Sequence, residues 1–486
     1  MVQPTTRHEP ASVQPPASAP PAATTLGELR ASGHQHRSVK EELRNNLLNH
    51  LRTGQDAFPG IVGFGQTVLP HLERAIIAGH DVILLGERGQ GKTRLIRTLT
   101  GLLDEWTPTV AGCEINDHPY APACARCRRL AAELGDDLPI AWQPRDDRYG
   151  EKLATPDTSV GDLIGDIDPV KVAEGRTLGD PETIHYGLVP RTNRGIFCLN
   201  ELPDLAERIQ VALLNVLEER DIGVRGYSLR LPLDIVLVAS ANPEDYTNRG
   251  RIITPLKDRF GAEIRTHYPI SLEAELALIN QESQLAWRDG DPGAVLPVHL
   301  VQVIARFTRL VRASPAVDSR SGVSARFAIA AAEAVAASAV RRAAITGEEQ
   351  PVARVCDLPA VVSTLRGKVE FEVSEEGREQ EVLDHLLRRA TSDTFRAALG
   401  NADLTGLLAR FGDGGVVETG DLVAAADLLR RIGEVPGLAK IMERLQMSGG
   451  ESFGQAAAAL EFALEGLYLM RRLSKESVDG GAVYRT

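Results

Sequence analysis

One eight-residue motif limits what this chain can fold into more than any other feature. Residues 86–93 match the pattern G-x-x-x-x-G-K-[ST] at every position and comprise Gly86, Glu87, Arg88, Gly89, Gln90, Gly91, Lys92 and Thr93. A short apolar run, residues 81–85, precedes the motif, and helix-forming sequence, residues 93–103, follows it. This is the strand–loop–helix context in which such a loop places its backbone N–H groups around phosphate oxygens at a helix N-terminus. The sequence therefore predicts a site for ATP.

Two side chains of the motif have expected roles in that site. Lys92 should reach the β- and γ-phosphates, and the Thr93 hydroxyl should bind Mg²⁺. The alternative is a glycine-rich turn that matches by chance, which the flanking strand and helix disfavour. A dinucleotide-binding G-x-G-x-x-G loop does not fit, because Arg88 occupies the position of the second glycine.

A second segment, residues 195–202 (GIFCLNEL), has the form of a Walker B strand that ends in a polar pair. Glu201 is the candidate base that orients the attacking water. Asn200 stands where an aspartate usually holds the magnesium shell, and it keeps an acceptor oxygen without the negative charge. The alternative is a core strand that ends at a charged turn.

Three further polar residues are candidates for the same site. Asn242 follows an apolar strand and is a candidate sensor 1 that positions the water. Arg259, in the sequence LKDRF, is a candidate arginine finger for the nucleotide of a neighbouring subunit. Arg326 stands at the expected start of a helix and is a candidate sensor 2. Each of the three has a plain alternative as a surface residue.

The chain divides by composition into four regions. Residues 1–35 are rich in Pro, Ala, Ser and Thr and are expected to form a disordered tail. Residues 36–270 alternate short β-rich runs with helical ones, which predicts an α/β core with a parallel sheet between helices. The expected buried strands are residues 82–85, 196–199 and 235–239. Residues 271–372 are expected to form an all-helical lid, and residues 373–486 a helical C-terminal region.

Charge and hydropathy exclude several classes of protein. The chain has 54 basic and 66 acidic residues, a net charge of −12, which disfavours a duplex-binding protein. No apolar run has the length of a membrane span, and the N-terminal residues lack the apolar segment of a secretory signal. A cytoplasmic protein that binds neither nucleic acid nor membrane is therefore expected.

Three of the five cysteines cluster in an insert, residues 113–150. Cys113, Cys124 and Cys127, together with His118, have the residue types of a structural zinc site. Asp117 is the alternative fourth ligand. Three ordinary reduced cysteines, or an iron–sulfur cluster, are the other interpretations.

Several longer segments resemble one family. PGIVGFGQTV, TSVGDLIGDIDPVKVAEGR, HYGLVPRTNRGIFCLNELPDL and VLEERDIGVRGYSLRLPLDIVLVASANPED resemble the ATPase module of the magnesium chelatase I-subunit and the related MoxR ATPases. The last of these contains a candidate β-hairpin between Val224 and Leu229. The resemblance implies an AAA+ fold, a homo-hexameric ring with ATP at its interfaces, and a partner with a von Willebrand-type metal-binding domain.

The resemblance leaves three functions open. The first is an ATP-hydrolysing motor that remodels a partner, either for metal insertion or for enzyme maturation. The second is a non-catalytic, nucleotide-dependent scaffold, which Asn200 favours. The third is an AAA+ transcriptional regulator. This sequence departs from the family pattern at Asn200, in the cysteine-bearing insert and after Glu372.

Overall fold

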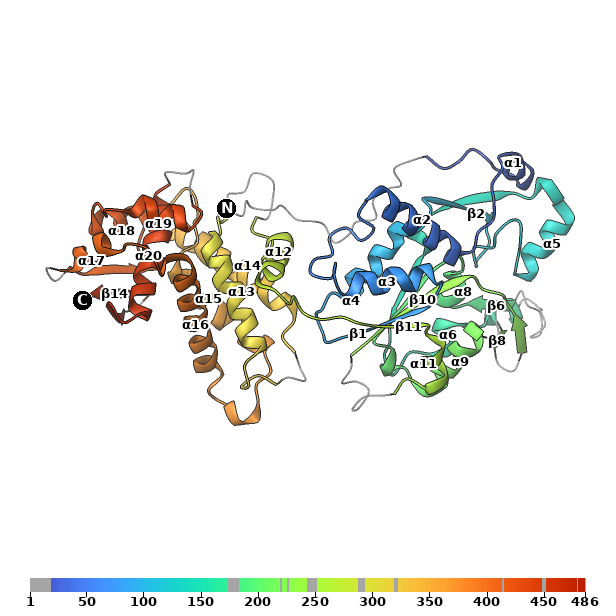
Figure 1. Cartoon of the computed structure of the whole chain (residues 1–486). Helices are drawn as coiled ribbons and strands as arrows, with labels where there is room; N and C mark the ends of the chain where they lie inside the picture. The colour runs from blue at the N-terminus through green and yellow to red at the C-terminus, as the bar shows by residue number, and fades with distance from the viewer. Residues whose placement is uncertain are drawn as a thin grey trace. The chain divides into compact units, whose positions relative to one another are not determined.

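The computed structural model describes most of the chain, in two compact units. It covers residues 19–173, 183–218, 221–224, 227–242, 251–286, 293–318, 322–412, 415–447, 452–478 and 480–485, with the backbone alone at 216–230. Both units are drawn in Figure 1. The division between them lies between His267 and Tyr268.

A five-stranded parallel sheet forms the centre of the N-terminal unit. Its strand order is β11-β1-β10-β7-β4, with β11 Ala262–Arg265, β1 Val82–Leu85, β10 Ile235–Ala241, β7 Gly195–Asn200 and β4 Tyr149–Leu153. The three strands expected from apolar runs are β1, β7 and β10, and all three are buried along their length. The α/β core predicted from the sequence is confirmed.

Side chains alternate along these strands between two hydrophobic cores. Val82 and Leu84 contact the core that contains α2 Val39–Thr53, α3 Val68–Ile77 and α4 Lys92–Thr98. Ile83 and Leu85 contact the opposite core, to which α6 Val160–Leu163, α8 Leu188–Arg191, α9 Glu207–Glu218 and α11 Thr254–Arg259 contribute. Period-two alternation thus gives each face of the sheet its own layer of helices.

The cysteine-bearing insert is built on an antiparallel pair, β2 Trp106–Val110 and β3 Ile140–Pro144, with α5 Ala125–Leu134 between them in sequence. A short helix, α1 Leu26–Ala31, packs on this pair. Leu26 and Leu29 are buried, and the Leu26 N–H donates to Leu138 O at 2.9 Å.

Part of the expected disordered tail is therefore ordered. Residues 19–35 are described, because Thr25 caps α1 and two leucines three residues apart give the helix an apolar face. Residues 1–18 of that tail lie outside the described residues.

The N-terminal unit also contains smaller elements outside the five-stranded sheet. They are α7 Pro169–Ala173 and two antiparallel pairs, β5 Gly165–Ile167 with β6 Ile184–Tyr186 and β8 Asp221–Val224 with β9 Tyr227–Arg230. The predicted hairpin is confirmed as β8–β9, with Tyr227 already paired to Val224. Its tip, residues 225–226, lies outside the described residues.

The C-terminal unit is mainly helical around one hydrophobic core. Its helices are α12 Leu272–Glu282, α13 Val298–Arg312, α14 Ala325–Thr346, α15 Pro359–Leu365, α16 Glu379–Leu399, α17 Thr405–Leu408, α18 Ala425–Ile432, α19 Leu438–Arg444 and α20 Phe453–Leu469. The core extends from Ile279 to Tyr484, so the expected lid and the expected C-terminal region share it. A three-stranded antiparallel sheet, β12 Val417–Gly420, β14 Gly481–Arg485 and β13 Ser474–Val478, adds strands that the sequence did not predict.

Single 3-10 turns connect many of these elements: η1 Leu99–Leu102, η2 Gly135–Asp137, η3 Arg145–Arg148, η5 Leu202–Asp204, η6 Val355–Asp357, η7 Arg366–Lys368, η8 Val373–Glu375 and η9 Ala409–Phe411. Among the described parts of the chain, no helix has both the length and the apolar character needed to span a membrane.

Candidate nucleotide site

The phosphate-binding loop lies between β1 and α4, at the carboxyl edge of the parallel sheet. Gly89 and Gly91 have φ angles of 72° and 79°, a left-handed conformation that glycine adopts without strain. A Cβ at Gly86 would lie 2.0 Å from Thr266 Oγ1, so only glycine fits there. The Thr266 hydroxyl donates to Gln90 Oε1 at 2.7 Å, which fixes the loop against the strand next to β1. The loop therefore has a defined backbone path for phosphate.

Lys92 lies inside the loop and is buried. Its Nζ donates to Gly86 O, to Glu87 O at 3.1 Å and to Asn242 Oδ1 at 2.7 Å. Thr93 is the second residue of α4 and is half-buried. An ammonium group held by two backbone carbonyl oxygens of the loop is suited to neutralising phosphate charge.

Asn242 connects Lys92 to Glu201. The Asn242 side-chain amide accepts from Lys92 through Oδ1 and donates to Glu201 Oε2 through Nδ2 at 3.1 Å. These residues follow β1, β10 and β7, three neighbouring strands whose carboxyl ends meet at one edge of the sheet. The fold thus brings together three of the residues that the sequence assigned to this site.

Glu201 has a backbone conformation that is unusual for its residue type. Its φ and ψ are 55° and 48°, in the left-handed region, which costs about 1–3 kcal/mol for a residue with a side chain. Its N–H donates to Ser240 Oγ at 3.3 Å, a contact that helps to hold this turn. The conformation directs the end of β7 toward Asn242 and not into a continued strand.

Asn200 forms a pair with a carboxylate that sequence reasoning missed. Asn200 Nδ2 donates to Glu151 Oε1 at 2.7 Å, and Ser240 Oγ donates to Asn200 Oδ1 at 3.1 Å. The other Glu151 oxygen accepts from Arg97 Nε at 2.9 Å, one helical turn after Thr93. A negative charge therefore lies beside the position where the Walker B aspartate is missing. No motif identified Glu151, because its proximity arises only from the pairing of β4 with β7.

A buried ion pair fixes the start of β4. Arg148, at the end of η3, donates through both terminal nitrogens to the two oxygens of Glu42, each at 2.7 Å, and both side chains are buried. The Arg148 Nε donates to Arg194 O at 2.8 Å. Two parallel charge-assisted bonds define one geometry for the side chains. The pair therefore connects α2 to the strand that carries Glu151.

The two candidate arginines lie in different units. Arg259 is the last residue of α11 in the N-terminal unit, and its side chain is exposed. Arg326 is the second residue of α14 in the C-terminal unit, and its side chain is also exposed. Their roles as arginine finger and sensor 2 stay predictions.

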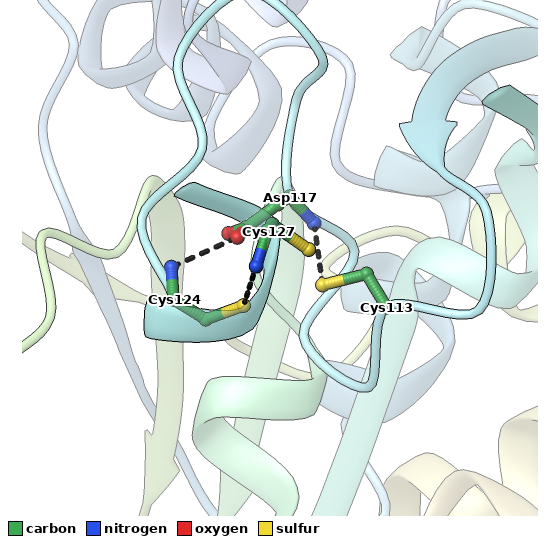
Figure 2. A group of neighbouring side chains, drawn as sticks. All are labelled: Cys113, Asp117, Cys124 and Cys127. Carbon is green, nitrogen blue, oxygen red and sulfur yellow. Dashed lines mark hydrogen bonds between the residues drawn. The ribbon is translucent and has the colours of Figure 1, made fainter. Parts of the chain in front are cut away.

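The cysteine cluster contains Asp117 and not His118 (Figure 2). The ligand atoms of Cys113, Asp117, Cys124 and Cys127 all lie within 4.8 Å of one another. His118 Nδ1 instead accepts the Tyr120 N–H at 3.0 Å, and its ring lies 4.2 Å from that of His36. The structure thus places the alternative fourth ligand, Asp117, in the group and the expected His118 outside it.

Comparison with known proteins finds related sequences that match part of this chain. The magnesium-chelatase 38 kDa subunit of Acidiphilium rubrum is 31% identical over 209 residues, which is 41% of this chain and 55% of that protein. The magnesium-chelatase subunit ChlI of Guillardia theta is 30% identical over 242 residues, 48% of this chain and 62% of that protein. This chain is an AAA+ ATPase related to the magnesium chelatase I subunits.

Two further comparisons concern parts of this AAA+ chain. A family model described as the Sigma-54 interaction domain matches residues 177–259. A solved structure of the complex between subunits BchI and BchD of magnesium chelatase is 20% identical, with a TM-score of 0.35, over 67% of this chain and 98% of that one. The chain spans less than two thirds of the length of the two chelatase subunits described above.

Proposed function

We propose that this chain binds ATP with Mg²⁺ and hydrolyses it as a motor that remodels a partner protein. The observation that carries the proposal is the hydrogen-bonded line from Lys92 through Asn242 to Glu201. It joins a phosphate-neutralising cation to a carboxylate base through an amide that can position water between them.

The orientation of the Asn242 amide supports this assignment. With Oδ1 toward the Lys92 ammonium and Nδ2 toward the Glu201 carboxylate, every bond pairs a donor with an acceptor. A flipped amide would place donor against donor and acceptor against acceptor. Asn242 therefore has one favourable orientation, which fixes the separation of the cation from the base.

The donor set near Asn200 is suited to Mg²⁺. The Thr93 hydroxyl, the Asn200 amide oxygen and the Glu151 carboxylate are the hard oxygen ligands that this ion prefers, directly or through water. We infer that Glu151 supplies the negative charge that Asn200 lacks. When bound, the ion neutralises charge that develops on the transferred phosphoryl group.

Kinship with the chelatase subunits supports the proposed partners. From the relation to the chelatase subunits, we infer that this chain forms a homo-hexamer and acts on a partner with a von Willebrand-type metal-binding domain. Arg259 would then act on the nucleotide of a neighbouring subunit, and Arg326 would act as sensor 2. The work done on the partner would be metal insertion or enzyme maturation.

Phosphate release by the purified chain tests the proposal. Lys92→Ala should lower turnover at least about 100-fold, because it removes the ammonium that neutralises phosphate charge. Glu201→Gln should retain ATP binding and lower kcat about 10²- to 10⁴-fold. The exposed residues Lys368 and Glu207 provide matched controls as Lys368→Ala and Glu207→Gln, which should keep parent activity. ATP binding without turnover, with and without partner, would favour the scaffold function instead.

A second candidate function is an AAA+ transcriptional regulator, which the match of residues 177–259 to the Sigma-54 interaction domain favours. The matched segment includes the β8–β9 hairpin. ATP-dependent retention of RNA polymerase containing sigma-54 by the immobilised chain would support this function. Retention of a von Willebrand-type partner, with no polymerase bound, would support the remodelling motor.

A further inference from the structure

Three cysteines and one aspartate converge in the insert of the N-terminal unit, away from the residues of the nucleotide site. Cys113 and Asp117 come from the loop after β2, whereas Cys124 and Cys127 come from the start of α5 (Figure 2). All four ligand atoms lie within 4.8 Å of one another. We propose that these four residues bind one structural zinc ion.

The spacing of the ligand atoms is close to that of a tetrahedral site. Sulfur atoms about 2.3 Å from a common zinc ion lie about 3.8 Å apart in a tetrahedron. Because the ligand atoms here all lie within 4.8 Å of one another, a contraction of about 1 Å or less is enough. Side-chain rotation within two short loops can supply that movement.

Backbone N–H groups already point at two of the sulfurs. The Asp117 N–H donates to Cys113 Sγ at 3.4 Å, and the Cys127 N–H donates to Cys124 Sγ at 3.3 Å. Arg126 Nη1 lies 3.9 Å from Cys127 Sγ. Cys124 is also the N-cap of α5, where the helix dipole favours negative charge. These donors are placed to hydrogen-bond zinc-bound sulfurs, as groups around a structural metal site do.

Asp117 provides a second, independent observation. Its side chain is 1% exposed, and Oδ2 accepts the Cys124 N–H at 2.8 Å. Its Oδ1 is buried and has no hydrogen-bond partner among the described residues. A buried carboxylate oxygen without a partner is costly, and a cation between it and the thiolates removes that cost.

The ligand types favour zinc over other groups. An iron–sulfur cluster of the common kind needs four cysteine thiolates, and the cluster has three. Thiolates disfavour Mg²⁺ and Ca²⁺, which take oxygen ligands. Three thiolates and a carboxylate also leave no open position for water in a four-coordinate site, which is typical of a structural zinc ion.

The loop of residues 113–117, which carries two of the proposed zinc ligands, contacts the segment that leads into the Walker B strand β7. Asn116 Nδ2 donates to Arg191 O at 2.8 Å, and Asn193 Nδ2 donates to Ile115 O at 2.9 Å. Asn193 Oδ1 in turn accepts the Asp234 N–H at 2.8 Å, just before β10. A zinc ion that fixes residues 113–117 would therefore also fix the start of β7 and β10. This role does not depend on whether the chain hydrolyses ATP.

Elemental analysis of the full chain, purified without a His-tag, tests the site. We expect about one zinc per chain. Zinc should be lost in Cys124→Ser/Cys127→Ser, and the zinc affinity should fall at least about tenfold in Asp117→Asn. His118→Gln separates the two candidate fourth ligands and should keep its zinc. Cys356→Ser, in the C-terminal unit, is the matched cysteine control and should also keep it.

A measurement on the unsubstituted chain covers the case in which the cysteine variants do not fold. Removing metal with a strong chelator should expose three additional thiols to a thiol reagent, and stoichiometric zinc should protect them again. Metal-free, folded protein with these three thiols freely reactive would overturn the proposal. So would iron with acid-labile sulfide, or a double cysteine variant that retains zinc.

Discussion

At the scale of single residues, the Walker B position carries the neutral side chain of Asn200, with the carboxylate of Glu151 beside it. Asn200 keeps a side-chain oxygen that accepts from Ser240, and its amide nitrogen contacts Glu151 at 2.7 Å. Under the proposed function, Glu151 on the neighbouring strand β4 supplies the carboxylate that β7 lacks. The charge at the metal site would then depend on both residues and not on position 200 alone.

Exchanging the two side chains tests this pairing. Glu151→Gln should raise the Mg²⁺ concentration for half-maximal ATPase activity about tenfold, a free-energy change of about 1.4 kcal/mol, because a neutral amide replaces the carboxylate. Adding Asn200→Asp to Glu151→Gln restores one carboxylate and one amide and should return the magnesium dependence toward that of the parent. The control Glu207→Gln should leave it unchanged. An unaltered magnesium titration in Glu151→Gln would show that this carboxylate does not serve the metal.

At the scale of elements, helix boundaries follow the local sequence. The burial of side chains within a helix depends instead on the segments of the chain that pack against it. α2 begins after Ser38, which forms a capping box with Glu41, and ends at Gly54 with φ 70°. α13 carries His299 in its first turn, and this side chain is buried against Phe462 with ring centroids 4.5 Å apart. The sequence of α13 alone does not reveal that environment.

The burial of His299 predicts how stability depends on pH. Burial lowers the pKa of His299 to about 3. In the unfolded chain, the pKa of this histidine is about 6.5. Between about pH 6.5 and pH 3, the unfolded chain therefore binds a proton at His299 that the folded chain does not bind. Stability from this residue is thus present above about pH 6.5 and is lost toward pH 3, by at most about 1.4 kcal/mol per pH unit.

Calorimetry of the full chain at pH 7 and pH 5 measures this effect. His299→Leu keeps an apolar side chain in the core and should reduce the loss of stability between the two pH values. His385, exposed on α16, gives the control His385→Leu, which should keep the parent dependence. An unchanged pH dependence in His299→Leu would mean that other groups cause the acid sensitivity.

At the scale of the whole molecule, the proposed site is completed by a second copy. Lys92, Asn242 and Glu201 come from one chain, whereas Arg259 is exposed at the end of α11, where a neighbouring subunit's nucleotide could meet it. An exposed arginine finger has a catalytic use only in an oligomer. We therefore predict that the ATPase activity requires the oligomer.

Mixing two inactive variants tests that link. In an equimolar ring of Arg259→Ala and Lys92→Ala chains, about a quarter of the interfaces pair an intact P-loop with an intact arginine, so activity should partly return. Lys92→Ala mixed with Glu201→Gln is the control, because both defects lie in the same half-site and no interface becomes complete. Full activity in a strictly monomeric chain would contradict the shared site.

The sequence by itself determined the parts of this protein that depend on local pattern. The P-loop, the buried strands β1, β7 and β10 and the capped helix α2 were predictable because glycine positions, apolar runs and caps act over a few neighbouring residues. Glu201 and Asn242 were predictable because each follows such a strand.

Only the tertiary structure decided which distant side chains meet. Glu151 lies on a strand with no apolar run and reaches Asn200 solely because β4 pairs with β7. Asp117 and not His118 joins the cysteines, although the two are neighbours in sequence, because the turn after Cys113 directs their side chains to different environments. Residues 19–35 are ordered because β3 and the residues before it offer partners for α1. In each case the free energy comes from contacts between segments far apart in the chain, and local sequence does not encode those contacts.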